Sequence, residues 1–113
     1  MTTPYRSAAA AELAAAADRL VSRTGHWTPA RWAAASHTGT GSRADDVFAL
    51  VTRLADACAA VEGRAARPVP RLDTDLVLPD QLRVMIADLV AAGADDPVLM
   101  TAADAVRATT AAL

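Results

Sequence analysis

The sequence contains a single cysteine, Cys58, and neither lysine nor asparagine. One cysteine excludes an internal disulfide and a cysteine-based zinc site. Such a chain fits a reducing compartment, so we expect a cytoplasmic protein. We also expect it to hold no metal and no other cofactor. Arginine supplies all 11 basic side chains and aspartate supplies 11 of the 13 acidic ones. This bias is typical of a GC-rich coding sequence.

Long hydrophobic runs are also lacking. No stretch approaches the roughly 20 apolar residues that a membrane-spanning helix needs. The most apolar stretch, 84–94, contains Asp88, and the alanine-rich stretch after Arg6 is interrupted by Glu12 and Asp18. We therefore expect neither a membrane partner nor a signal peptide.

The charge balance argues against nucleic acid as the main partner. The formal net charge is −2 and the isoelectric point is about 5.5. Proteins that neutralise phosphates usually carry an excess of positive charge.

The 113 residues match one domain of ordinary size, and we expect residues 1–113 to form a single helical domain. Hydrophobic residues make up 53 % of the chain, but 30 of them are alanines. A chain of this mass should expose roughly 5,900 Å² when folded, about one third of the unfolded value. One core is therefore possible without disulfides or metals.

Alanine is the strongest helix former, and the larger apolar residues recur at helical spacing. This pattern predicts substantial helices over about 7–23, 43–62, 79–92 and from 96 onward, with a short helix over about 29–36. The predicted helix boundaries include Gly25 as a left-handed cap, Ser42 in a capping box with Asp45, and Asp96-Pro97 as an N-cap with a first-turn proline. The predicted core residues are Leu13, Leu20, Val47, Leu50, Val51, Leu54, Cys58, Val61, Leu82, Met85, Ile86, Leu89, Leu99, Val106 and Leu113.

Residues 64–78 form one long connection. Pro68-Val69-Pro70 imposes an extended path, because each proline fixes its own φ and restrains the residue before it. We expect Leu76-Val77-Leu78 to lie across the helices as a short strand or an extended cover. The sequence thus predicts an all-α fold: an up-down-like four-helix bundle with one short extra helix and one long proline-containing connection.

Both tryptophans and both histidines fall between His26 and His37. If Thr28 caps the short helix, Trp27 and Trp32 have the spacing of a hydrophobic staple, which fixes how the chain enters a helix. The alternative is an aromatic wall of a ligand pocket, with Arg31 as an anion partner.

His26 and His37 lack the close spacing and nearby carboxylates of metal ligands, so solvent-exposed or capping roles are favoured. The glycine-containing segment before Ser42 and Arg43 is either a flexible hinge or an anion site at a helix start. The small basic patch at Arg64, Arg67 and Arg71 flanks the prolines and gives only a weak indication of a docking segment.

The sequence shows no catalytic constellation. Cys58 lies on the apolar stripe of its helix, where a buried thiol is inert packing. Ser36 and Ser42 have a histidine nearby but no acid placed to orient it. An enzyme is therefore disfavoured.

We expect a non-catalytic interaction or regulatory module that binds a protein partner or a second copy of itself, because Val84, Val90 and Val98 fall outside the predicted core faces. The alternative is a small-molecule binding protein, for an anion or an aromatic ligand, or an atypical enzyme with its pocket around 26–43. The candidate binding residues of that pocket are His26, Trp27, Arg31, Trp32, His37, Ser42 and Arg43.

Overall fold

The computed structural model describes residues 7–38 and 41–113, and 71 % of the described residues are helical. The helices are α1 (Ala8–Thr24), α2 (Pro29–Ala33), α3 (Arg43–Val61), α4 (Leu78–Ala91) and α5 (Asp96–Ala112), with a short 3-10 helix, η1 (Asp75–Val77). No strand occurs among these residues. The predicted all-α fold is confirmed, with its four substantial helices, one short extra helix and one long proline-containing connection.

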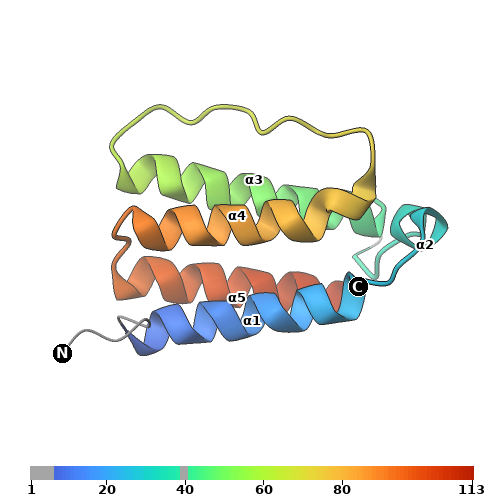
Figure 1. The fold of residues 1–113 in the computed structure, drawn as a ribbon, viewed down its shortest axis with the longest axis horizontal. Coiled ribbons are helices and arrows are strands. Elements are labelled where there is room, and N and C mark those ends of the chain that lie inside the picture. The colour runs from blue at the N-terminus through green and yellow to red at the C-terminus, as the bar shows by residue number, and fades with distance from the viewer. Residues whose placement is uncertain (1–6, 39–40) are drawn as a thin grey trace.

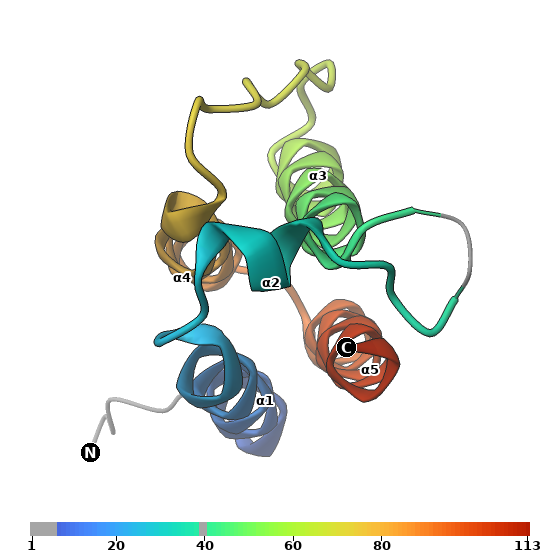
Figure 2. The ribbon, with the colours of Figure 1, turned by 90° about the vertical axis from the view of Figure 1, so that its right-hand side faces the viewer.

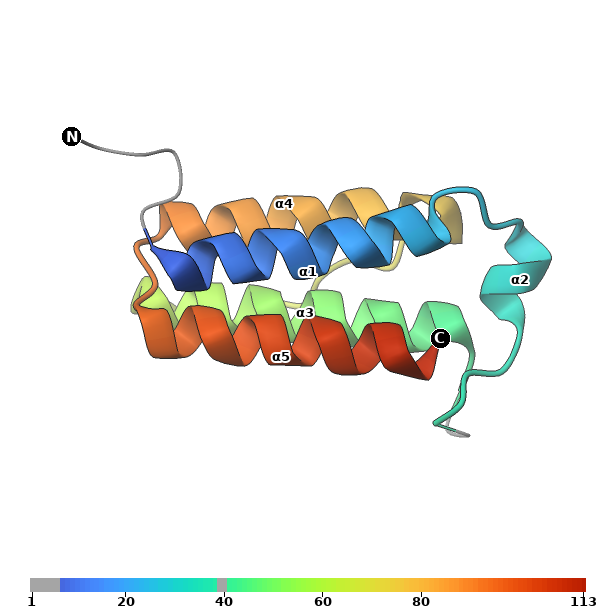
Figure 3. The same cartoon turned by 90° about the horizontal axis from the view of Figure 1, so that it is seen from below.

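The four long helices form a square (Figures 1 and 2). Helix α1 packs against α4 and α5, and α3 packs against the same two helices from the opposite corner. Helices α1 and α5 run in one direction, side by side, as the view from below shows (Figure 3). Helices α3 and α4 both run the other way, so the alternation expected of an up-down bundle is interrupted between α3 and α4 (Figure 1).

This arrangement follows from the connection between α3 and α4, which runs back along the outside of α3 over the length of the bundle (Figure 1). Arg71 holds it there: its guanidinium contacts the carboxylates of Asp45 and Asp75 at 3.2 and 3.3 Å and lies 4.8 Å from the centre of the Phe48 ring. Val69 is packed against the hydrophobic core.

The core is built from the predicted helical faces. Alanines of α1 and α5 and larger aliphatic residues of α3 and α4 fill it, and all the predicted core residues are buried except Val61 and Met85, which are partly buried. The accessible surface of 6354 Å² is close to the value expected from the mass.

Helix boundaries follow local signals in most places. The Ser42 hydroxyl accepts from the Asp45 amide at 3.0 Å, and the Asp45 carboxylate accepts from the Ser42 amide at 3.2 Å, which confirms the capping box. Gly63 and Gly93 have φ of +70° and +81°, the left-handed conformation that glycine adopts without strain after a helix. The N-cap of α5 is Asp95, one residue before the predicted position.

Three local predictions are wrong. Gly25 is not left-handed: its φ is −64°, because its amide continues the helical pattern by donating to the Val21 carbonyl. Helix α2 ends at Ala33 rather than near Ser36, because Ala34 turns into an extended conformation and its carbonyl accepts from the Arg43 amide. Residues 76–78 form neither a strand nor an extended cover, since η1 leads directly into α4 at Leu78.

Candidate functional site

Residues 26–43, here called the elbow, connect α1 to α3 and contain every candidate binding residue of the sequence analysis. Helix α2 lies across the end of the bundle, between the ends of α4 and α3 (Figure 2). The Thr28 hydroxyl caps α2 by accepting from the Arg31 amide at 3.2 Å, and Pro29 begins the helix. An isolated antiparallel bridge between Ala35 and Ser42 then returns the chain to α3.

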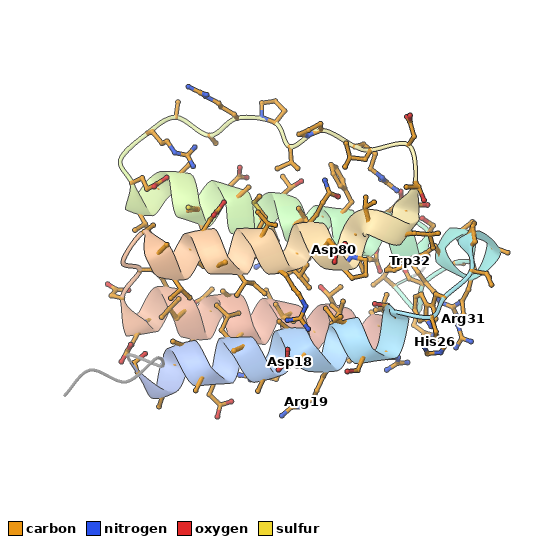
Figure 4. The ribbon with its side chains drawn as sticks, in the orientation of Figure 1. Asp18, Arg19, His26, Arg31, Trp32 and Asp80 are labelled. Atoms are coloured by element: carbon orange, nitrogen blue, oxygen red, sulfur yellow. The ribbon has the colours of Figure 1, made fainter. Side chains whose placement is uncertain are left out.

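Trp27 and Trp32 form the expected staple. Their ring centres are 5.0 Å apart at an interplanar angle of 69°, an edge-to-face contact. The two residues are only 4 % and 0 % exposed, so both are part of the core. Figure 4 shows Trp32 at the end of the bundle, near Arg31 and His26. This geometry favours the structural interpretation of the pair, because edge-to-face aromatic contacts stabilise a fold beyond the area they bury.

Arg31 and Arg43 come together on Trp27. Their guanidinium carbons lie 5.1 and 5.4 Å from the centre of the indole ring, and Arg43 Nη1 donates to the Arg31 carbonyl at 3.2 Å. Neither guanidinium forms an ion pair with a residue that the structure describes. The Trp27 Nε1 and Arg43 Nε atoms are buried without a hydrogen-bond partner. The two arginines thus shield the indole through cation–π contacts.

The histidines do not converge on a site. Both His26 and His37 are exposed, and the His37 amide donates to the Ala112 carbonyl at 2.9 Å, which ties the elbow to the end of α5. Within residues 7–38 and 41–113, no group of three or more His, Cys, Asp or Glu side chains is placed to hold a metal ion.

The predicted hinge or anion site at the start of α3 is partly outside the described residues, because Gly39 and Thr40 are not described. The part that is described is a capped helix start. The pKa of the Asp45 carboxyl is lowered, first by the hydrogen bond from the Ser42 backbone and then by that from Arg71. Asp45 thus supplies the negative charge at this helix start.

A hollow of about 390 Å³ lies beside the elbow, between the end of α1 and the start of α4. The contribution of α4 and η1 to this hollow differs from the predicted pocket, which lay within 26–43. His26 and the two tryptophans line it, but Arg31, His37, Ser42 and Arg43 do not. The other lining residues are Val21, Thr24, Gly25, Leu76, Pro79 and Asp80. Trp27 Nε1 has almost no accessible surface, so this donor does not point into open space.

Cys58 is buried, as expected from its place on the apolar stripe of α3. Burial raises the pKa of its thiol, and the neighbouring Glu62 carboxylate raises it further. The thiol therefore stays protonated near neutral pH, which is the opposite of what a nucleophile needs.

A second hollow, a groove of about 600 Å³, lies between α3 and α5, away from the elbow. Arg53 is its single charged residue and Thr101 its single hydroxyl. The rest of the lining is Leu54, Ala57, Ala60, Val61, Pro97, Val98, Ala102 and Ala105. No pattern in the sequence predicts this groove, although Val98 falls outside the predicted core face. The groove forms because facing alanines leave the space between the two helices unfilled.

Comparison of the chain with protein-family models, with curated proteins and with solved structures finds no match. In the part of the chain that the structure describes, none of the helices has the length and apolar character required to span a membrane.

Proposed function

We propose that this protein is a non-catalytic, self-associating helical bundle whose α3–α5 side receives a second copy of the chain. The observation that carries the proposal is the apolar groove along that side. The helix pair leaves Val61 and Val98 only partly buried, and it lines the groove with alanines that allow a neighbouring helix to approach closely.

The lining favours a macromolecular partner over a small ligand. Small-molecule sites combine an apolar wall with a few convergent polar groups that fix the orientation of the ligand. In this groove the Thr101 hydroxyl already donates to the Pro97 carbonyl at 2.9 Å, which leaves Arg53 as the main polar group. We also propose a cytoplasmic location, because a chain whose single cysteine forms no internal disulfide fits a reducing compartment.

Light scattering coupled to size-exclusion chromatography tests the proposal directly. We expect a mass near twice 11.7 kDa at micromolar concentration. Val98→Asp should shift the protein to monomer, because it places a charge inside the groove. Val84→Asp is the matched control: Val84 is 53 % exposed on α4, and this variant should remain dimeric. A mass near 11.7 kDa at all concentrations, or equal behaviour of the two variants, would refute the proposal.

Small-molecule binding at the elbow is the second candidate, and the hollow of about 390 Å³ supports it. Both tryptophans line this hollow, so their fluorescence reports on any occupant. We would titrate a set of small aromatic acids and follow indole emission. Saturable binding that is lost in His26→Ala, with unchanged unfolding, would favour this function, and the absence of any saturable response would dismiss it.

A further inference from the structure

The outer side of α3 carries a ridge of four exposed residues: Ala49, Arg53, Asp56 and Ala60. Their spacing of four, three and four residues places them on one side of the helix. Ala60 and Arg53 also line the groove between α3 and α5, so the ridge forms one edge of that groove.

This ridge is self-complementary under a two-fold rotation. A rotation of 180° about an axis perpendicular to α3, midway between Arg53 and Asp56, exchanges Ala49 with Ala60 and exchanges the arginine with the aspartate. Opposite charges therefore occupy symmetric positions, and small residues flank them on both sides. Neither charge forms an ion pair with another described residue of the same chain.

Helix α5 contributes no charge to the lining of the groove. Its residues in the lining are Pro97, Val98, Thr101, Ala102 and Ala105. The nearby charges of this helix are engaged elsewhere: Arg107 pairs with Asp104 at 2.9 Å and with Glu12 of α1 at 3.3 Å, on the other side of α5. Arg53 and Asp56 of the α3 ridge are thus two charges at the edge of the groove that form no ion pair with another described residue.

Resting on the proposed function, we propose that two copies pack through their α3–α5 sides about a two-fold axis, with α3 antiparallel to α3 of the partner. Arg53 then pairs with the partner's Asp56 twice, and Ala49 packs on the partner's Ala60. Closed two-fold interfaces of this kind are the commonest in homo-oligomers.

The size of the molecule is sufficient for such an interface. The molecule extends 46 × 28 × 21 Å, and an interface that buries the standard area of about 800 Å² per partner would take up most of one long side. The ridge itself has no net charge, which suits a second copy better than a strongly acidic or basic partner.

The test is a charge exchange across the proposed axis. Arg53→Asp and Asp56→Arg each create two like-charged pairs in a homodimer, so each should weaken dimerisation at least tenfold. An equimolar mixture of the two variants restores both opposite-charge pairs and should form a heterodimer of near wild-type affinity. The double variant should also recover. Arg19→Asp and Asp88→Arg, at exposed positions of α1 and α4, are the matched controls and should dimerise as wild type.

Dissociation constants come from sedimentation equilibrium, and far-UV circular dichroism checks that each variant is folded. If the wild type and all charge variants dimerise equally while Val98→Asp does not, the proposed axis is wrong although self-association through the groove stands. If the two single variants weaken the dimer but their mixture does not regain near wild-type affinity, the pairing of Arg53 with the partner's Asp56 is refuted. A monomeric wild type refutes both the axis and the function.

Discussion

Replacing Trp27 by alanine tests whether the elbow is held by its staple. The side chain is 4 % exposed, and removing a buried tryptophan costs about 3–5 kcal/mol through lost burial and the cavity left behind. The edge-to-face contact with Trp32 is worth about 0.5–1.5 kcal/mol more, and each guanidinium about 0.5–1 kcal/mol. Because such terms are not additive, we expect the free energy of unfolding to fall by about 4 kcal/mol, a large share of the stability of a small domain.

Trp27→Phe is the matched control, because the Nε1 atom that it removes has no hydrogen-bond partner. Phenylalanine keeps an aromatic ring and loses no hydrogen bond, so we expect it to cost less than half as much as alanine. Urea unfolding followed by far-UV circular dichroism, at one fixed protein concentration, gives both free energies. A loss below about 1 kcal/mol for Trp27→Ala, or equal losses for the two variants, would contradict the staple.

Three further outcomes are expected. Leu82→Ala, at a position 0 % exposed, should cost about 2–5 kcal/mol in urea titrations, whereas Val84→Ala on the exposed side of α4 should change stability by less than about 0.5 kcal/mol; similar losses would mean that the helix is rotated. Because the folded state lowers the pKa of Asp45, its contribution to stability is complete above the ordinary carboxyl range and is lost as pH falls through the lowered value. The urea midpoint should therefore fall less between pH 5 and pH 2 in Asp45→Asn than in wild type, and identical pH profiles would refute this role. Circular dichroism should give a helix content of about two thirds, since 71 % of the described residues are helical, and a value below about 40 % would contradict the bundle.

The fold was predictable because its signals are local. The Ser42 capping box, the spacing of the core residues of α3 and the two tryptophans around Thr28 are each contained within a few turns of chain. Wherever such a signal is present, the structure follows the expectation within a few residues.

The features that sequence reasoning missed depend on contacts between distant segments. The α3–α5 groove requires knowing that these two helices are neighbours, whereas the up-down-like expectation would place them at opposite corners of the bundle. Arg31 and Arg43 meet on Trp27 only because the chain turns back at the Ala35–Ser42 bridge. Gly25 was misassigned because glycine after a helix permits a left-handed conformation without requiring it.

The reach of the connection after α3 determines the topology of the whole molecule. Helix α3 has 19 residues and is about 28 Å long, so an extended chain needs about nine residues to return along it. Lengthening the segment around residues 65–66 should cost little, since the entropy of closing a loop grows slowly with its length. Shortening it to a tight turn leaves α4 able to pack only antiparallel to α3. A deletion in this exposed segment would thus change which helices are neighbours, without altering any residue of the four long helices.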